Sequence, residues 1–156
     1  MAKKILVAID DSENAMRAVE FVADTFTADN RITLFNVVQD TAVMCEMNSP
    51  ELTPYFTSQQ SSFCLLEDKK KELVDKALQK SKTLLLNAGF DEQNITVKAE
   101  LKKSGVARDI IKEAQSGYNV IVLGKRGVSG IKEFLLGSIS QKVFNLAKDI
   151  SVLFVN

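Results

Sequence analysis

The stretch KILVAIDDSENAMRAVEFVADTF, residues 4–26, decides the fold class. Its opening, Lys4–Ile9, is an almost unbroken apolar run, which is typical of a strand buried on both faces of a parallel sheet. A helix is predicted over Ser12–Phe26, because apolar residues recur there at helical spacing and form one stripe. That stripe consists of Ala15, Val19, Val22, Ala23 and Phe26. The pattern therefore predicts a buried strand followed at once by a helix that packs on the sheet.

The same alternation continues along the chain. Four more strands are predicted, over Arg31–Val38, Asn94–Leu101, Tyr118–Gly124 and Ser151–Val155. Three more helices are predicted, over Leu66–Ala88, Val106–Gln115 and Ser138–Lys148. Gly89 and Gly117 follow two of these helices, where left-handed caps are expected. Strands alternating with helices predict right-handed crossovers and an open parallel five-stranded α/β sheet with helices on both faces.

Residues 39–64 interrupt this rhythm. The segment contains both prolines, several Ser and Gln residues and no sustained periodicity. We expect an irregular insertion in one domain that spans residues 1–156, either a surface insertion, a lid or a mobile excursion. Cys45 and Cys64 lie in it and fit no metal-ligand spacing. Because a cytoplasmic protein is expected, we expect these cysteines to be reduced, structural thiols.

Composition limits the classes of function. The chain has 156 residues, with 20 Lys and Arg against 20 Asp and Glu, and it contains no histidine. A formal net charge of zero predicts no broad attraction to nucleic acid or anionic lipid. The absence of histidine removes the commonest general base and most zinc sites. No apolar run suits a signal peptide or a membrane span, so we expect a soluble cytoplasmic protein.

A ligand site is expected where the order of the strands reverses, beyond their C-terminal ends. The first strand ends there at Asp10, and the fourth ends at Gly124, followed by Lys125 and Arg126. Glycines at 124 and 127 permit positive φ and close approach of the backbone to a ligand, and their amides can surround an anion. Gly137 and Ser138 open the last helix, whose N-terminus favours phosphate.

Plainer interpretations of the same residues stay open at this point. The glycines are also compatible with a simple turn, and Lys125 and Arg126 with solvated loop charges. Ser138 and Gln141 also fit a capping box. Asp10 is also a possible cap of the first helix, although Asp11 or Ser12 can fill that position equally well.

The spacing Gly124-x2-Gly127-x9-Gly137-Ser138 resembles the G-x2-G-x9-G-[ST] ATP-binding signature of the universal stress proteins. The resemblance extends along the chain, through ILVAIDDSENAMRAVEFV, LFNVV, SGVARDIIKEA, YNVIVLG and SVLFV. It implies a Rossmann-like sheet of order 3-2-1-4-5, frequent homodimers, and binding of ATP, ADP or AMP, with Mg²⁺ as a possible bridge between phosphates.

The resemblance also implies roles for individual residues. Asp10 would contact the adenosine moiety and the backbone of Val37 the adenine, while Leu123 and Gly124 would lie near the ribose. The residues implied for the phosphates are Gly127, Gly137, Ser138 and the amide of Ile139. Two departures are Asn36, where many members have His, and Val128, where a polar or basic residue is common.

These observations favour an adenine-nucleotide-binding stress or signalling module rather than a fast enzyme, since no general base is evident near Ser138. Two alternatives are a slow ATP-hydrolysing or nucleotidyl-transferring enzyme that uses Glu46 and Glu51 of residues 39–64, and a dimeric interaction module with an empty site. The apolar last strand, Ser151–Val155, would expose a sheet edge, which predicts a homodimer through this strand.

Overall fold

The structure is a computed structural model that describes residues 1–39, 45, 54–125 and 136–156. The strands are β1 (Lys4–Ala8), β2 (Arg31–Val38), β3 (Ile95–Leu101), β4 (Val120–Gly124) and β5 (Ser151–Val155). The helices are α1 (Glu13–Thr25), α3 (Pro54–Asn87), α4 (Val106–Ala114) and α5 (Ser138–Leu146), and a short 3-10 turn covers Glu92–Asn94. Every predicted strand and helix is present, and all their boundaries agree within two residues except the start of α3.

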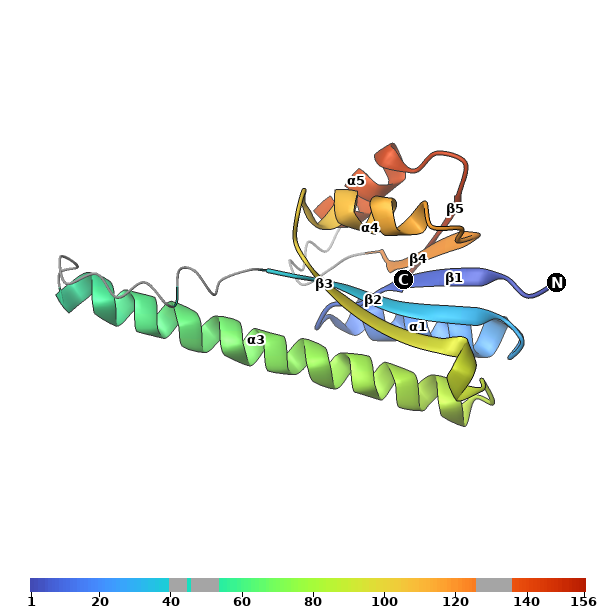
Figure 1. The fold of residues 1–156 in the computed structure, drawn as a ribbon, viewed down its shortest axis with the longest axis horizontal. Coiled ribbons are helices and arrows are strands. Elements are labelled where there is room, and N and C mark those ends of the chain that lie inside the picture. Colours follow the sequence, from blue (N-terminus) through green and yellow to red (C-terminus); the bar gives the residue numbers. More distant parts are fainter. Residues whose placement is uncertain (40–44, 46–53, 126–135) are drawn as a thin grey trace.

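All five strands are parallel and follow the order β3-β2-β1-β4-β5. The Rossmann-like order 3-2-1-4-5 is thereby confirmed. Helices α1 and α3 lie on one face of the sheet, and α4 and α5 lie on the other (Figure 1).

Alternation along the strands supplies both cores, because neighbouring residues point to opposite faces. Ile5, Val7 and Leu34 pack under α1 and α3. Leu6 and Phe35 pack under α4 and α5. These five side chains are at most 1% exposed, which explains why β1 reads as a continuous apolar run.

The predicted irregular stretch is wrong for residues 54–64, because α3 begins at Pro54 rather than at Leu66. Proline suits a first helical position, where its missing N–H is not needed. The polar residues that follow are exposed wherever their side chains are described, so no apolar stripe marks this part of the helix in the sequence. The rest of the predicted insertion, 40–44 and 46–53, lies outside the described residues.

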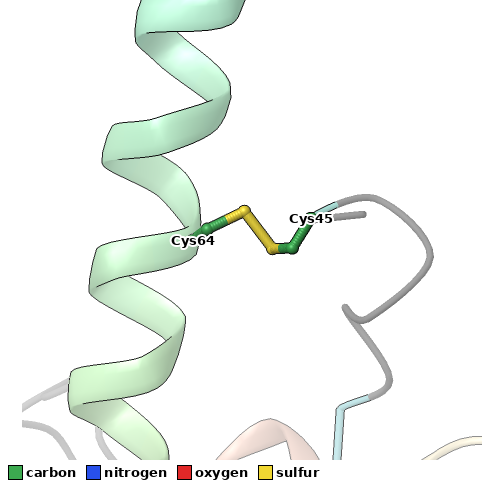
Figure 2. The surroundings of a disulfide bond; sticks show 2 residues. All are labelled: Cys45 and Cys64. Carbon is green, nitrogen blue, oxygen red and sulfur yellow. A yellow bond between two sulfur atoms is a disulfide. The ribbon is translucent and has the colours of Figure 1, made fainter. Parts of the chain in front are cut away.

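The expectation of reduced thiols is also wrong in this structure. Cys45 and Cys64 form a disulfide, with their Cα atoms 5.8 Å apart (Figure 2). The two residues are 19 positions apart in the sequence, and only the return of the chain along α3 brings them together. Spacing alone carried no signal for this pairing.

Candidate functional site

The candidate site lies at the C-terminal ends of β1 and β4, where the order of the strands reverses. β1 pairs with β2 on one side and with β4 on the other. The segments that leave these strands therefore diverge toward opposite faces of the sheet. This is the position at which the sequence predicted a ligand.

The loop after β1 is organised by Asp10 and Ser12. Ser12 is the N-cap of α1, and its Oγ accepts a hydrogen bond from the backbone N–H of Ala15 at 3.2 Å. Asp10 Oδ1 accepts a hydrogen bond from the backbone N–H of Ser12 at 2.8 Å. The helix is thus capped by Ser12, and Asp10 keeps its second carboxylate oxygen unpaired among the described residues.

Asp11 is a residue that the predicted site omitted. Its Oδ1 is buried and has no hydrogen-bond partner within the described part of the chain. A buried carboxylate oxygen without a partner is costly, so it suits a position that a hydroxyl donor or a cation fills on binding. Sequence gave a signal only in the doubled carboxylate, Asp10-Asp11, at the end of a buried strand.

Gly124 is required by packing rather than by its φ angle. A Cβ placed on it would lie 2.8 Å from the backbone carbonyl carbon of Asn14. Its φ is not among the positive values, so the positive φ that glycine permits is not used at this position. Glycine here lets β4 approach the first turn of α1, which brings Gly124 close to the Asp10–Ser12 loop.

Two hydrogen bonds hold the start of α5 against the end of β4. The backbone N–H of Gly137 donates to the carbonyl of Lys125 at 2.9 Å. The Ser140 hydroxyl donates to the carbonyl of Gly124 at 2.9 Å. These two bonds bring the first turn of α5 next to the end of β4, although the paired residues are more than ten positions apart in the chain. Ser140 was absent from the predicted site, because its role depends on this tertiary contact.

The capping-box interpretation of Ser138 and Gln141 is wrong. Gly137 is the N-cap of α5, and no side chain caps this helix. The Ser138 hydroxyl is exposed and has no partner among the described residues. Ser138 and Ile139 occupy the first turn, where backbone N–H groups lack helical partners and the helix dipole favours an anion.

The remaining residues predicted to contact the ligand differ in burial and in the groups they leave available. Leu123 is only 4% exposed and packs under α4 and α5, so its side chain belongs to the core. Val37 is half-buried on the same face. The Lys125 side chain is half-buried and makes no interaction with described residues, while its backbone N–H donates to the carbonyl of Val155 at 2.7 Å.

Asn36 stabilises the edge that carries the site. Its Nδ2 donates to the carbonyl of Ile9 at 2.7 Å, and the residue is 9% exposed. The backbone N–H of Ile9 in turn donates to the carbonyl of Phe35. Asn36 therefore extends the link between β2 and β1 beyond the last strand pair, and its amide is already engaged within the protein.

Asp109 orders the loop between β3 and α4. Its two carboxylate oxygens accept hydrogen bonds from the backbone N–H groups of Lys103 and Ser104, at 2.8 and 3.0 Å. These donors hold the pKa of Asp109 below its ordinary value, the bond from Lys103 being the largest cause. Favourable hydrogen bonds to the ionised form outweigh burial, which acts in the opposite direction.

Several predicted residues lie outside the described part of the chain. Arg126 and Gly127 fall in the segment 126–135, and Glu46 and Glu51 in 46–53. The described ranges contain no cluster of three or more Asp, Glu, Cys or His residues that could hold a metal ion. None of the described helices is long and apolar enough to cross a membrane.

Comparison with known proteins identifies a family and two relatives of known sequence. The model of the universal stress protein family matches residues 1–156. Universal stress protein YxiE of Bacillus subtilis is 27% identical over 149 residues, covering 94% of this chain and 95% of its own length. A universal stress protein of Mycolicibacterium smegmatis is 28% identical over 144 residues, which cover 92% of this chain and 45% of that protein.

Three solved structures are similar to this chain over almost its whole length. The hypothetical protein MJ0577 superposes with a TM-score of 0.71 at 25% identity, over 99% of this chain and 96% of that one. UspA of Lactobacillus plantarum has a TM-score of 0.68 at 20% identity, over 99% and 97% of the two chains. A universal stress protein in complex with cAMP has a TM-score of 0.64 at 17% identity, over 99% and 97%.

Proposed function

Because this chain belongs to the universal stress protein family, we propose that it is an adenine-nucleotide-binding module whose occupancy by ATP, ADP or AMP alters its shape or its choice of partner. The observation that carries this proposal is that Gly137 and Ser140 hydrogen-bond the start of α5 to the end of β4, where Gly124 packs against the first turn of α1. We propose that the N–H groups at the start of α5 and the Ser138 hydroxyl bind the phosphates, and that the carboxylates after β1 bind the rest of the nucleotide.

Each part of the nucleotide has a proposed contact. Phosphates bind the first turn of α5, at the amide of Ile139 and the hydroxyl of Ser138, with Gly127, Lys125 and Arg126 contributing from the loop that follows β4. Asp10 binds the adenosine hydroxyls. The backbones of Val37 and Leu123 flank the base and the ribose. The solved relative in complex with cAMP supports an adenine nucleotide as the ligand class.

Mg²⁺ would be held by phosphate oxygens together with Asp11. The buried, unpartnered Oδ1 of Asp11 supports this assignment, because a divalent cation is a strong partner for an ionised carboxylate. The ion would neutralise phosphate charge near the two aspartates. We propose a binding role rather than rapid hydrolysis, because the chain contains no histidine to serve as a general base.

The test is thermal unfolding with ATP, AMP, cAMP, GTP or no ligand, in the presence of Mg²⁺. A ligand at about 100 times its dissociation constant stabilises the native state by about 2.7 kcal/mol, which raises Tm by roughly 5–10 °C at this chain length. We expect a shift with adenine nucleotides. Absence of a shift with every adenine nucleotide would contradict the proposal.

A hydroxyl variant locates the site. Ser138→Ala removes an exposed hydroxyl that forms no hydrogen bond with described residues, so the unliganded Tm should stay unchanged. Loss of one hydrogen bond to a charged phosphate weakens affinity for ATP by roughly tenfold to a hundredfold. Ser116→Ala is the matched control, since Ser116 is exposed just beyond the C-terminus of α4. Equal ATP affinities for the two variants would place the phosphates elsewhere.

A further inference from the structure

The disulfide between Cys45 and Cys64 links the segment that follows β2 to the N-terminal third of α3 (Figure 2). Cys45 is exposed and Cys64 is half-buried, so an attacking thiolate can reach the bond from solvent. Within the described residues no cysteine remains free. We propose that this pair is a site of reversible thiol–disulfide exchange that controls the order of the N-terminal part of α3.

The part of α3 that the disulfide holds is not anchored in the core. Its described side chains from Gln59 to Leu73 include none that is buried, and among the described side chains of the helix the first buried one is Val74. Leu65 and Leu66, which a core helix would bury, are 69% and 68% exposed. Figure 1 shows this part of α3 extending past the C-terminal ends of the strands. Packing against the sheet therefore begins only in the second half of the helix.

The helix propensity of residues 54–64 does not stabilise this part of α3 either. Residues 54–64 read PYFTSQQSSFC, with few strong helix formers and no apolar stripe. Short helices without tertiary contacts are marginal in water. Cross-linking a loop of this length reduces the entropy of the unfolded segment, which on the chain-entropy model changes a local equilibrium by about a hundredfold. The covalent link is thus a restraint on this part of the helix that core packing does not supply.

The exchange reaction is a two-electron step. A thiolate of a dithiol reductant attacks one sulfur, the Cys45–Cys64 bond breaks, and a mixed disulfide forms with release of one protein thiolate, which takes up a proton. The second thiol of the reductant then loses its proton and displaces the other cysteine as a thiolate, which is protonated in turn. The reductant leaves as a disulfide, and the protein carries two thiols. Reoxidation by a small-molecule disulfide such as oxidised glutathione reverses both steps.

Hydrogen–deuterium exchange of the full chain tests the proposal. Oxidised protein, protein reduced with dithiothreitol, and the Cys45→Ser/Cys64→Ser double variant are compared by peptide mass spectrometry. We expect amides of residues 54–66 to exchange up to about a hundredfold faster in the reduced protein and in the double variant. Amides of residues 74–85 should exchange equally in all three, because that part of α3 packs in the core.

Two controls make the outcome decisive. Dithiothreitol should change nothing in the double variant, and reoxidation with oxidised glutathione should restore slow exchange in the wild type. Equal exchange of residues 54–66 in oxidised and reduced protein would overturn the proposal. So would failure of the intact mass to fall by the two hydrogens of a disulfide after treatment with oxidised glutathione.

Discussion

At the scale of single residues, the polar side chains of the candidate site fall into two groups, those that hydrogen-bond to the backbone and those that do not. Ser12, Asn36 and Ser140 each make a hydrogen bond that positions the backbone. Ser138 and the Oδ1 of Asp11 make none with the residues that the structure describes. Groups of the first kind build the edge of the sheet, and groups of the second kind are available to a ligand. Sequence reasoning found Ser138 but could not separate these two classes.

Asp109 gives a prediction about pH at this scale. Its pKa is lowered from an unfolded value near 3.8, so the stability it contributes is fully present above that pH and is lost as pH falls through the lower folded value. Asp109→Asn should therefore lower the urea midpoint at pH 7, with the difference from wild type shrinking below about pH 4. Urea unfolding followed by circular dichroism at pH 3, 4, 5 and 7 measures this.

The control for Asp109 is Asp75→Asn. Asp75 is exposed on α3 and forms no hydrogen bond or ion pair with described residues. Its variant should follow the wild-type midpoint at every pH. A difference between Asp109→Asn and wild type that stays constant down to pH 3 would show that the carboxylate charge is not the cause.

At the scale of elements, α3 consists of two halves that differ in burial. Its C-terminal half packs beneath the sheet through Val74, Leu78 and Leu85, and Leu85 is 0% exposed. Its N-terminal half has no buried side chain among those described. Helical periodicity in the sequence therefore predicted only the second half, because apolar periodicity records burial rather than helix formation itself.

A pair of identical substitutions in this helix tests that division. Leu85→Ala should destabilise the protein by about 2–5 kcal/mol, since it removes a fully buried side chain and leaves a cavity. Leu66→Ala should change the free energy of unfolding by less than about 0.5 kcal/mol, because Leu66 is 68% exposed. Urea unfolding measures both. Comparable losses in the two variants would mean that the projecting half is buried against something in solution.

At the scale of the whole molecule, the sheet has two edges, β3 and β5. Beside β5, Phe144 of α5 lies with its ring centroid 6.3 Å from that of Phe154 and is 60% exposed. An apolar edge strand flanked by an exposed aromatic side chain is a surface that soluble proteins usually cover. These features support the proposal of a homodimer through Ser151–Val155.

Phe144→Asp tests the dimer. Because the side chain is exposed, the fold should tolerate the change, whereas an aromatic at an interface often contributes 2 kcal/mol or more. We expect the dimer dissociation constant to rise by at least about tenfold in light scattering across a concentration series. Leu66→Asp, on the projecting part of α3, is the control and should leave the mass unchanged. A wild-type chain that is monomeric at micromolar concentration would exclude this interface.

Sequence by itself determined the fold class, the strands and, to within two residues, the extents of α1, α4 and α5, and it predicted where a candidate site lies. Those features follow from local periodicity and from glycine spacing, both of which are properties of short stretches of chain. Tertiary structure alone decided why Gly124 must be glycine, that Ser140 rather than a capping box holds α5, and that Cys45 meets Cys64. Each of these depends on contacts between residues distant in the sequence, and such contacts exist only once the sheet and its helices have packed.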